Sequence, residues 1–386
     1  MSANPDIRYI DSAAGLETLC AQLSGADWMA LDTEFLREKT YYPKLCLLQV
    51  AVPGVVACVD PLAIEDISPL LDVIYDPGIT KVMHAARQDM EILYHLRGNL
   101  PAPVFDTQIA ALLLGFSDQV GYGTLVSELL GVTLDKLHTR ADWSQRPLSP
   151  EQVRYAADDV IYLAQVYERL VERLGDLGRL DWLTEDFERL VQAELYSNPP
   201  QQAWLKVRGI NRIKGASLSV LQALAGWRES QAQRLDRPRG WLLRDDVMVD
   251  IARHLPGDRT ALGKIRGLSE RVVSKNAEQL LGLVGEARKR EPDPLPASGP
   301  KRRLKPEQDA LVDAMQAVVR LCALENSLNP AVLASRKQLE SLVIGGRDTG
   351  VMQGWRLKLA GERLQAMLDG ELVLRVSGGK LNLVNL

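Results

Sequence analysis

Two apolar segments, residues 45–52 and 55–59, are separated only by Pro53 and Gly54. Two residues cannot form the crossover that parallel strands need, so these segments must pair as an antiparallel hairpin. Three further short apolar segments lie at residues 28–33, 80–84 and 104–105. Helical patterns such as the one at 87–96 separate the later segments, and this spacing predicts parallel pairing. The first part of the chain therefore predicts an α/β domain in which helices flank a mixed sheet.

The alternation of strands and helices stops near residue 195, and the rest of the 386-residue chain reads almost entirely as helices. Prolines and a run of charge at residues 291–303 leave too little apolar sequence to fold, so this segment predicts a linker. Helical periodicity recurs on both sides of that linker. We therefore expect an α/β domain at residues 1–195, followed by two all-α helical-bundle domains at 210–290 and 304–386.

Charge and apolar content exclude some functions. A formal net charge of −4 argues against a protein that coats nucleic acid through a general basic excess, so any such contact must use local basic surfaces. No apolar run approaches the roughly 20 residues that span a bilayer, and the first residues do not resemble a secretory signal. The four cysteines are widely spaced and predict reduced thiols. We expect a cytoplasmic protein without membrane contact.

Two acids, Asp32 and Glu34, lie two residues apart at the end of the first predicted strand. Side chains at this spacing project from the same face of a strand, so the two carboxylates can share a metal ion. Like charges on one face of a mainly apolar strand repel each other and gain little from packing. A functional pair is therefore favoured, and a solvated strand end is the alternative.

A helix start is predicted at Ser149, which has Pro150 at the next position and Gln152 to complete a capping box. This start fixes the register of the helix. Tyr155 and Asp159 are four residues apart in it, so a phenol and a carboxylate lie on one face and can converge on one point. Asp158 lies about 100° around the helix and is not assigned to the site.

Asp89 falls in the first turn of the helix predicted after the strand at 80–84. A carboxylate here would point outward from the carboxyl end of the sheet, where α/β proteins usually have their sites. An acid in the first turn is also favoured by the helix dipole alone, which leaves a purely structural interpretation open.

Four acids at one point would repel strongly unless cations neutralise them. Ligation by oxygen alone predicts two divalent ions, Mg²⁺ or Mn²⁺, rather than zinc, and the chain has only four histidines. Two such ions could activate a water and stabilise the leaving oxygen of a phosphodiester. Tyr155 would orient the water, because a phenol is a weak base at neutral pH.

The spacings D-x-E at Asp32, H-x4-D at His84 and Y-x3-D at Tyr155 resemble the three exonuclease motifs of the DEDD superfamily, in its tyrosine-bearing branch. Four longer strings narrow the resemblance to the bacterial ribonuclease D family: LDTEFLREKTYYPKLCLLQVA, VFDTQIAALLLG, GYGTLV and ADWSQRPLSPEQVRYAADDV. The resemblance implies an RNase H-like fold, with Asp32, Glu34, Asp89 and Asp159 as metal ligands and Tyr155 beside the attacking water. It also implies 3′-to-5′ hydrolysis of RNA to 5′-mononucleotides, with transfer RNA precursors and other structured RNAs as substrates.

Six further residues are candidates for substrate contact: Thr33, Phe35, His84, Gln119, Tyr122 and Arg146. The resemblance places Thr33, Phe35 and the stretch 119–122 near the terminal nucleotides. The aromatic rings of Phe35 and Tyr122 could stack on bases, although either is more often part of a core or a hinge. His84 is more typical of a hydrogen-bonded strand end. Arg146 could hold a phosphate or anchor its own loop.

The helical tail has a resemblance of its own. Segments around residues 224–229, 236–240 and 262–267 resemble the HRDC domain, a small helical bundle, and the segment from 304 onward resembles a more divergent copy. Eight cations of the first bundle could contact an RNA backbone: Arg208, Arg212, Lys214, Arg234, Arg237, Arg239, Lys264 and Arg266. The alternative for each bundle is a packing or spacer role.

The same carboxylates are compatible with two other functions. A 3′-exonuclease acting on DNA would use the same metal chemistry, since only the 2′-OH distinguishes RNA. A non-catalytic nucleic-acid binding module would be expected to lack one of the acids or Tyr155, and all five residues are present. RNA is the expected partner, and the sequence predicts no obligate protein partner.

Overall fold

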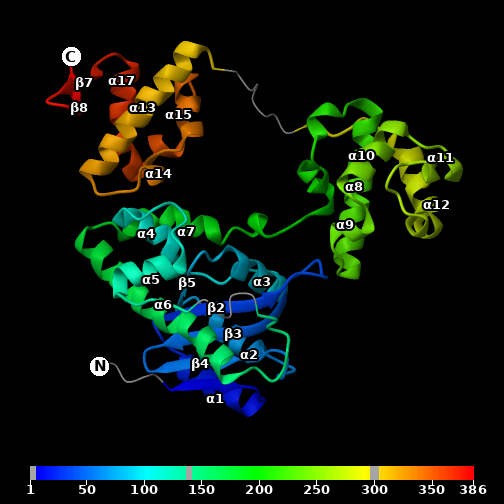
Figure 1. The fold of residues 1–386 in the computed structure, drawn as a ribbon, viewed down its shortest axis with the longest axis horizontal. Coiled ribbons are helices and arrows are strands. Elements are labelled where there is room, and N and C mark those ends of the chain that lie inside the picture. Colours follow the sequence, from blue (N-terminus) through cyan, green and yellow to red (C-terminus); the bar gives the residue numbers. More distant parts are fainter. Residues whose placement is uncertain (1–5, 136–140, 296–303) are drawn as a thin grey trace.

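The computed structural model describes residues 6–135, 141–295 and 304–386. Figure 1 shows an α/β domain, a helical unit attached to one side of it, and the C-terminal segment packed over α4 and α7. Among the described residues, no helix combines the length and the apolar composition that crossing a bilayer requires.

Within the described residues, one six-stranded sheet forms the centre of the α/β domain, with strand order β1-β4-β3-β2-β5-β6. Its strands are β1 (Ile7–Ile10), β2 (Trp28–Leu36), β3 (Lys44–Val52), β4 (Val55–Val59), β5 (Thr80–Met83) and β6 (Val104–Asp106). The β3–β4 hairpin is antiparallel and turns at Gly54, whose φ is +83°. Strand β2 pairs parallel with β5, and β5 pairs parallel with β6. The predicted mixed sheet is confirmed.

Two strands differ from the sequence prediction. Strand β1 was not predicted, because at four residues it has little periodic signal, and it adds a parallel edge to β4. Strand β2 continues to Leu36 instead of stopping near Thr33, so Glu34 is a full member of the sheet. A β-bulge follows between Glu34 and Phe35.

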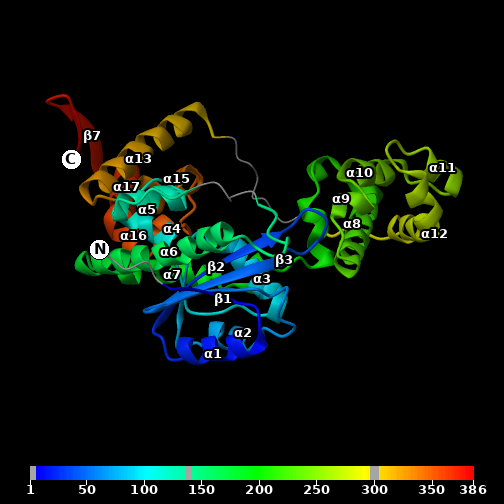
Figure 2. The ribbon, with the colours of Figure 1, turned by 60° about the horizontal axis from the view of Figure 1, so that its bottom comes forward.

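Helices cover both faces of the sheet, as Figure 2 shows for α1 and α2 on one side and α6 on the other. Those of this domain are α1 (Ala13–Leu23), α2 (Ser68–Ile74), α3 (Arg87–Arg97), α4 (Thr107–Ala111), α5 (Tyr122–Leu130) and α6 (Pro150–Asp176). Helix α6 begins at the predicted capping box: Ser149 accepts from the Gln152 N–H, and the Gln152 side chain accepts from the Ser149 N–H. Ala156 and Ala157 of this helix are fully buried, and such small side chains let a helix lie close to a sheet.

The first part of the tail has a hydrophobic core of its own, which includes Trp204, Leu221, Met248 and Leu280. Its helices are α8 (Gly215–Leu235), α9 (Arg239–Leu242), α10 (Asp245–His254), α11 (Arg259–Gly263) and α12 (Glu270–Ala287). We call this unit the first bundle. The chain reaches it through α7 (Thr184–Leu190) and short 3₁₀ turns at Leu180–Leu183, Ala193–Leu195, Pro200–Lys206 and Ile210–Arg212.

The first bundle is tied to the loop between β2 and β3. Asp236 accepts hydrogen bonds from the backbone N–H groups of Tyr41 and Tyr42, at 2.9 and 3.0 Å. The Tyr41 hydroxyl donates to Glu229, which is only 1% exposed, and Glu229 also pairs with Arg239. Arg239 was predicted as an RNA-contacting cation, but the structure gives it this different role because it neutralises a buried carboxylate.

The segment from 304 onward comprises α13 (Pro306–Glu325), α14 (Pro330–Leu333), α15 (Arg336–Val343), α16 (Gly354–Arg356), a π-helical turn (Leu357–Gly361), α17 (Glu362–Leu368), β7 (Leu372–Ser377) and β8 (Lys380–Asn385). The closing hairpin corrects the expectation of an all-helical domain. Apolar Leu381 and Leu383 alternate with polar residues in β8, and the two-residue connection Gly378-Gly379 has φ of +60° and +76°, which a tight hairpin turn requires. Most of the predicted linker, 296–303, lies outside the described residues.

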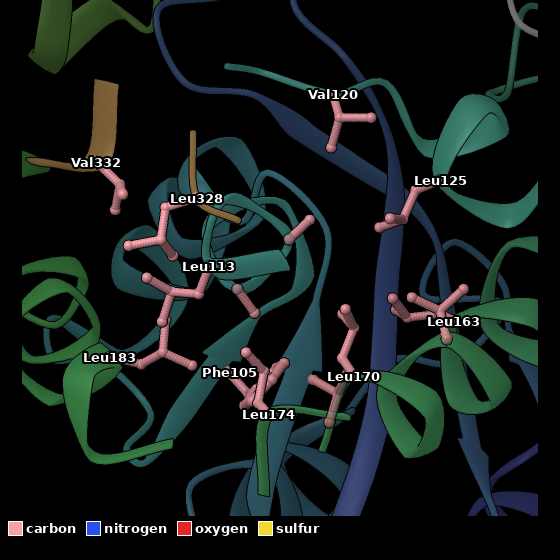
Figure 3. Close-up of a cluster of buried hydrophobic side chains, with 14 of the residues drawn as sticks. Phe105, Leu113, Val120, Leu125, Leu163, Leu170, Leu174, Leu183, Leu328 and Val332 are labelled. Carbon is pink, nitrogen blue, oxygen red and sulfur yellow. The ribbon is translucent and has the colours of Figure 1, made fainter. Parts of the chain in front are cut away.

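This C-terminal segment shares a hydrophobic core with the α/β domain. Leu328 and Val332 pack in one cluster with Phe105, Leu113 and Leu183, as Figure 3 shows. The rings of Trp182 and Trp355 stack with centroids 4.5 Å apart. The Arg179 guanidinium donates to the carbonyls of Leu113 and Asn326, one on each side of the junction. The segment therefore packs as part of the α/β domain and not as a separate spacer.

Replacing Leu328 by alanine should lower the free energy of unfolding of the α/β domain. Leu328 is 6% exposed within the shared core, and a buried leucine-to-alanine change costs about 2 to 5 kcal/mol. Urea unfolding measures the loss. Leu324→Ala is the matched control, because Leu324 lies four residues away and is 77% exposed. Equal midpoints for the two variants would contradict the shared core.

Candidate active site

Strand β2 and helix α6 present the candidate catalytic acids. Asp32 lies opposite Gln49 of β3, and Glu34 lies opposite Leu47, so the two acids share a face of the sheet. Helix α6 packs on this face, since Ala30 of β2 belongs to the same buried cluster as Ala156 and Val160 of α6.

Oxygen atoms of Asp32, Glu34 and Asp159 lie within 4.8 Å of one another. We call these three residues and Asp89 the carboxylate cluster. Asp89, in the first turn of α3, is 8% exposed and accepts a hydrogen bond from the Thr33 hydroxyl. The structure therefore brings together three of the four predicted acids directly and places the fourth beside them.

Burial raises the pKa of every acid in the cluster, and nearby carboxylates raise it further. Burial, followed by the charges of Asp159 and Asp89, raises the pKa of Glu34 to about 8. Burial, then Asp158, raises the pKa of Asp159 to about 7. Burial, then its three neighbours beginning with Asp89, raises the pKa of Asp32 well above its usual range. Burial also raises the pKa of Asp89 to about 6, although the Thr33 hydrogen bond opposes the rise.

These shifts mean that the cluster retains protons near neutral pH unless a cation balances its charge. The donors are carboxylate oxygens, which Mg²⁺ and Mn²⁺ prefer, and the site offers them from a strand and two helices. The residues present therefore fit a divalent-metal site.

Tyr155 lies one turn before Asp159 on α6, and both line a pocket of about 450 Å³ that opens beside the cluster. The Tyr155 ring lies 6.1 Å from that of Trp143. Asp158 lines the same pocket but pairs with Arg154 at 2.8 Å, and it is outside the converging set of acids. The predicted register of α6 thus places a phenol and a carboxylate at the pocket wall.

Three of the residues predicted near the substrate hold parts of the site in place. Thr33 donates to Asp89. The Tyr122 hydroxyl donates to the backbone carbonyl of Asp159. The two ring nitrogens of His84 contact the Thr107 hydroxyl at 2.9 Å and the Val120 carbonyl at 3.1 Å. These contacts fit the hydrogen-bonded interpretation of His84, and burial lowers the pKa of its ring.

Arg146 has the contacts of a loop anchor. Its guanidinium donates to both carboxylate oxygens of Asp60 and to the carbonyls of Cys46, Trp143 and Gln145. These bonds use all five N–H groups that an arginine has, so none is left for a phosphate in this arrangement.

Phe35 and Gln119 differ in exposure. Phe35 is partly buried against the core on the α1 side of the sheet. Gln119 is exposed in the loop before α5 and has a φ of +55°, a backbone conformation that non-glycine residues rarely adopt. Gln119 is the more accessible of the two.

Asp106 is a supporting residue that the sequence analysis missed. It is 3% exposed, caps α4, and accepts from the N–H groups of Ala85 and Ala86 just before α3. It therefore fixes the loop that leads into α3, the helix that carries Asp89. An aspartate between an apolar strand and a helix is an N-cap signal, which could have identified it.

Comparisons with known proteins cover nearly the whole chain. Residues 7–175 match a family described as 3′-5′ exonuclease, and residues 217–284 match the HRDC domain. Ribonuclease D of Sphingobium indicum is 38% identical over 380 residues, which are 97% of this chain and 97% of that protein. Ribonuclease D of Gluconacetobacter diazotrophicus is 39% identical, with 98% of this chain and 96% of that protein covered.

A solved structure is similar over the same length. The crystal structure of Escherichia coli RNase D, described as an exoribonuclease involved in structured RNA processing, superposes with a TM-score of 0.78. The two chains are 32% identical, and the match covers 95% of this chain and 99% of that one. The likeness therefore includes the tail as well as the α/β domain.

The melting temperature should respond to Mn²⁺ more strongly as the pH rises. A carboxyl group whose pKa is raised by folding makes its full contribution to stability at pH values below its pKa in the unfolded chain, near 4. This contribution is lost as the pH rises through the pKa values in the folded protein, about 6 to 8. The metal-free protein should therefore melt at a lower temperature at pH 8.5 than at pH 5. Mn²⁺ binds the ionised carboxylates and should restore the loss.

Asp32→Asn is the informative variant for this measurement. Removing one of the repelling charges should raise the melting temperature of the metal-free protein at pH 8.5 and diminish the shift on adding Mn²⁺. A metal-induced shift that is independent of pH, or unchanged in Asp32→Asn, would contradict metal binding at this cluster.

Proposed function

The chain belongs to the ribonuclease D family of 3′-5′ exoribonucleases, and we propose that its carboxylate cluster holds two divalent metal ions, Mg²⁺ or Mn²⁺, for hydrolysis. The resemblance to this family in the sequence motifs is confirmed. The products would be 5′-mononucleotides, released one at a time from the 3′ end of RNA.

The observation that carries this proposal is the convergence of Asp32, Glu34 and Asp159 within 4.8 Å, with Asp89 beside them. A buried group of like charges is unfavourable for folding, and divalent cations would remove the penalty. Asp32, Glu34, Asp89 and Asp159 would hold the ions. When bound, the ions supply positive charge that promotes ionisation of an attacking water and stabilises the developing charge on the phosphate.

Side chains of the protein position the reactants in this mechanism. Tyr155, at the wall of the pocket next to Asp159, orients the water for attack on the terminal phosphodiester. Two hydroxyl groups hold the acids in position. Thr33 donates to the Asp89 carboxylate, and Tyr122 donates to the backbone carbonyl of Asp159. Gln119 is exposed on the loop before α5 and is the proposed contact to the terminal nucleotides.

The proposed substrates are the 3′ ends of structured RNAs, transfer RNA precursors in particular. The E. coli relative is described as acting in structured RNA processing, which supports this class. The first bundle, which contains the HRDC match, would bind the RNA body while the 3′ end enters the pocket. The C-terminal segment is proposed as a divergent HRDC-like unit whose main role is to complete the catalytic domain, because the two share a core.

Asp32→Ala should abolish Mn²⁺-dependent shortening of RNA, because one shared ligand of the site is lost. Tyr155→Phe should lower kcat about 100-fold, the usual contribution of a positioned proton-transfer or orienting group, and should leave the Mn²⁺-induced thermal shift intact. The assay follows mononucleotide release from a 3′-labelled RNA. Glu168→Gln is the control, since Glu168 is an exposed acid further along α6 and away from the cluster. Undiminished cleavage by Asp32→Ala would overturn the metal proposal.

A matched pair of RNA and DNA oligonucleotides tests the choice of nucleic acid. RNA should be shortened faster, because only RNA presents a 2′-OH to the groups around the pocket. A transfer RNA precursor with a 3′ extension, digested in Mg²⁺ and in Mn²⁺, should lose that extension as 5′-mononucleotides. Equal rates on DNA and RNA would instead favour a general 3′-exonuclease.

A further inference from the structure

A second pocket, of about 500 Å³, lies on the first bundle between the end of α8, the short helix α9 and the start of α12. We call it the bundle pocket. Two tryptophans, Trp227 and Trp241, line it together with three cations, Arg237, Arg271 and Lys275. No acidic residue is among the described residues that line it. A concave site with this lining is suited to an anionic ligand that has flat aromatic groups.

Trp241 is the most exposed aromatic feature of the pocket. It is 56% exposed on α9, and the Arg237 guanidinium lies 5.9 Å from the centroid of its ring. Exposure of a large apolar ring is unfavourable in water, and such rings are common where they stack on a ligand. The ring and its neighbouring cation together form a platform for a nucleobase and its phosphate.

Trp227 is the more buried of the two tryptophans that line the bundle pocket. Its side chain is 9% exposed, and its indole N–H has no hydrogen-bond partner among the described residues. The nitrogen atom itself is not accessible to solvent, so the contribution of Trp227 is a largely apolar wall of the pocket.

The two cations of α12 add a binding surface for phosphates. Arg271 and Lys275 are four residues apart, so they share a face of the helix, and both are exposed. Neither makes an ion pair with any described residue. Cations without a carboxylate partner are available to phosphate groups.

We propose that the bundle pocket binds a single-stranded segment of the RNA, with one base stacked on Trp241 and the adjoining phosphates held by Arg271 and Lys275. The inference rests on the proposed function and names the part of the first bundle that recognises the substrate. The eight cations predicted from the sequence include Arg237 but neither cation of α12, because the sequence does not show which basic residues share a surface.

The bundle pocket is held in place relative to the carboxylate cluster. Asp236, which precedes Arg237, accepts the N–H groups of Tyr41 and Tyr42, and Arg239 pairs with the Glu229 carboxylate that also accepts from Tyr41. Tyr41 lies in the loop that follows β2, the strand that carries Asp32 and Glu34. One RNA that reaches both sites would therefore bind more tightly than either site alone allows, since the second contact is intramolecular.

Binding can be measured separately from cleavage. The probe is a fluorescein-labelled oligoadenylate of about 16 nucleotides, a length typical of single-strand sites, bound to the full chain in EDTA. Trp241→Ala should weaken binding about 10-fold, and Trp241→Phe should retain most of the affinity because it keeps an aromatic face. Melting temperatures equal to wild type establish that both variants fold. Wild-type affinity in Trp241→Ala would overturn the proposal.

The charges are tested by the salt dependence of the same binding. Arg271→Ala/Lys275→Ala should lower the slope of log affinity against log salt by about 1.4, which corresponds to two phosphate contacts on a single strand. Arg288→Ala/Lys289→Ala is the matched control, since it removes two exposed cations just beyond the other end of α12. Equal changes in slope for the two pairs would contradict a specific pocket.

The two proposals fail in distinguishable ways. If the bundle pocket does not bind RNA, the wild-type chain should still shorten RNA in the presence of Mn²⁺. Absence of that shortening would remove the proposed function, while binding in EDTA would still decide whether the pocket takes RNA.

Discussion

Repulsion among buried carboxylates is the constraint on which the arrangement of this protein depends. Asp32 and Glu34 lie on one face of β2, and α6 brings Asp159 within 4.8 Å of both. Burial and like charge raise the pKa of each acid, so the assembled site is under electrostatic stress in the absence of cations. Packing elsewhere in the domain must offset the unfavourable free energy of this site, as is common where function opposes folding.

Two regions supply this stability, the helix α6 and the C-terminal segment. The capped helix α6 lies on the sheet through Ala156 and Ala157. The C-terminal segment completes the core beyond it with Leu328 and Val332. The first bundle has its own core and connects through polar contacts at Tyr41, which suits its proposed role of holding RNA at a set distance from the cluster.

Local patterns made much of this fold predictable. The Pro53-Gly54 turn and the capping box at Ser149 are short-range signals, and they fixed the mixed sheet and the register of Tyr155 and Asp159. Features that depend on distant contacts were not predictable in this way. The bonds of Arg146 to Asp60 and Cys46, the contacts of Arg239 and Glu229 with Tyr41, and the shared core at Leu328 each join residues far apart in the chain. The hairpin β7–β8 was missed because its alternating pattern is short and lies after a long helical stretch.

The four acids are proposed to act together as one two-metal site. Anomalous diffraction from crystals of the protein soaked in Mn²⁺ would test it most directly. We expect two peaks about 3.5 to 4 Å apart, bound by Asp32, Glu34, Asp89 and Asp159. Peaks confined to other carboxylates, or a single ion that leaves Asp89 without contact, would contradict it.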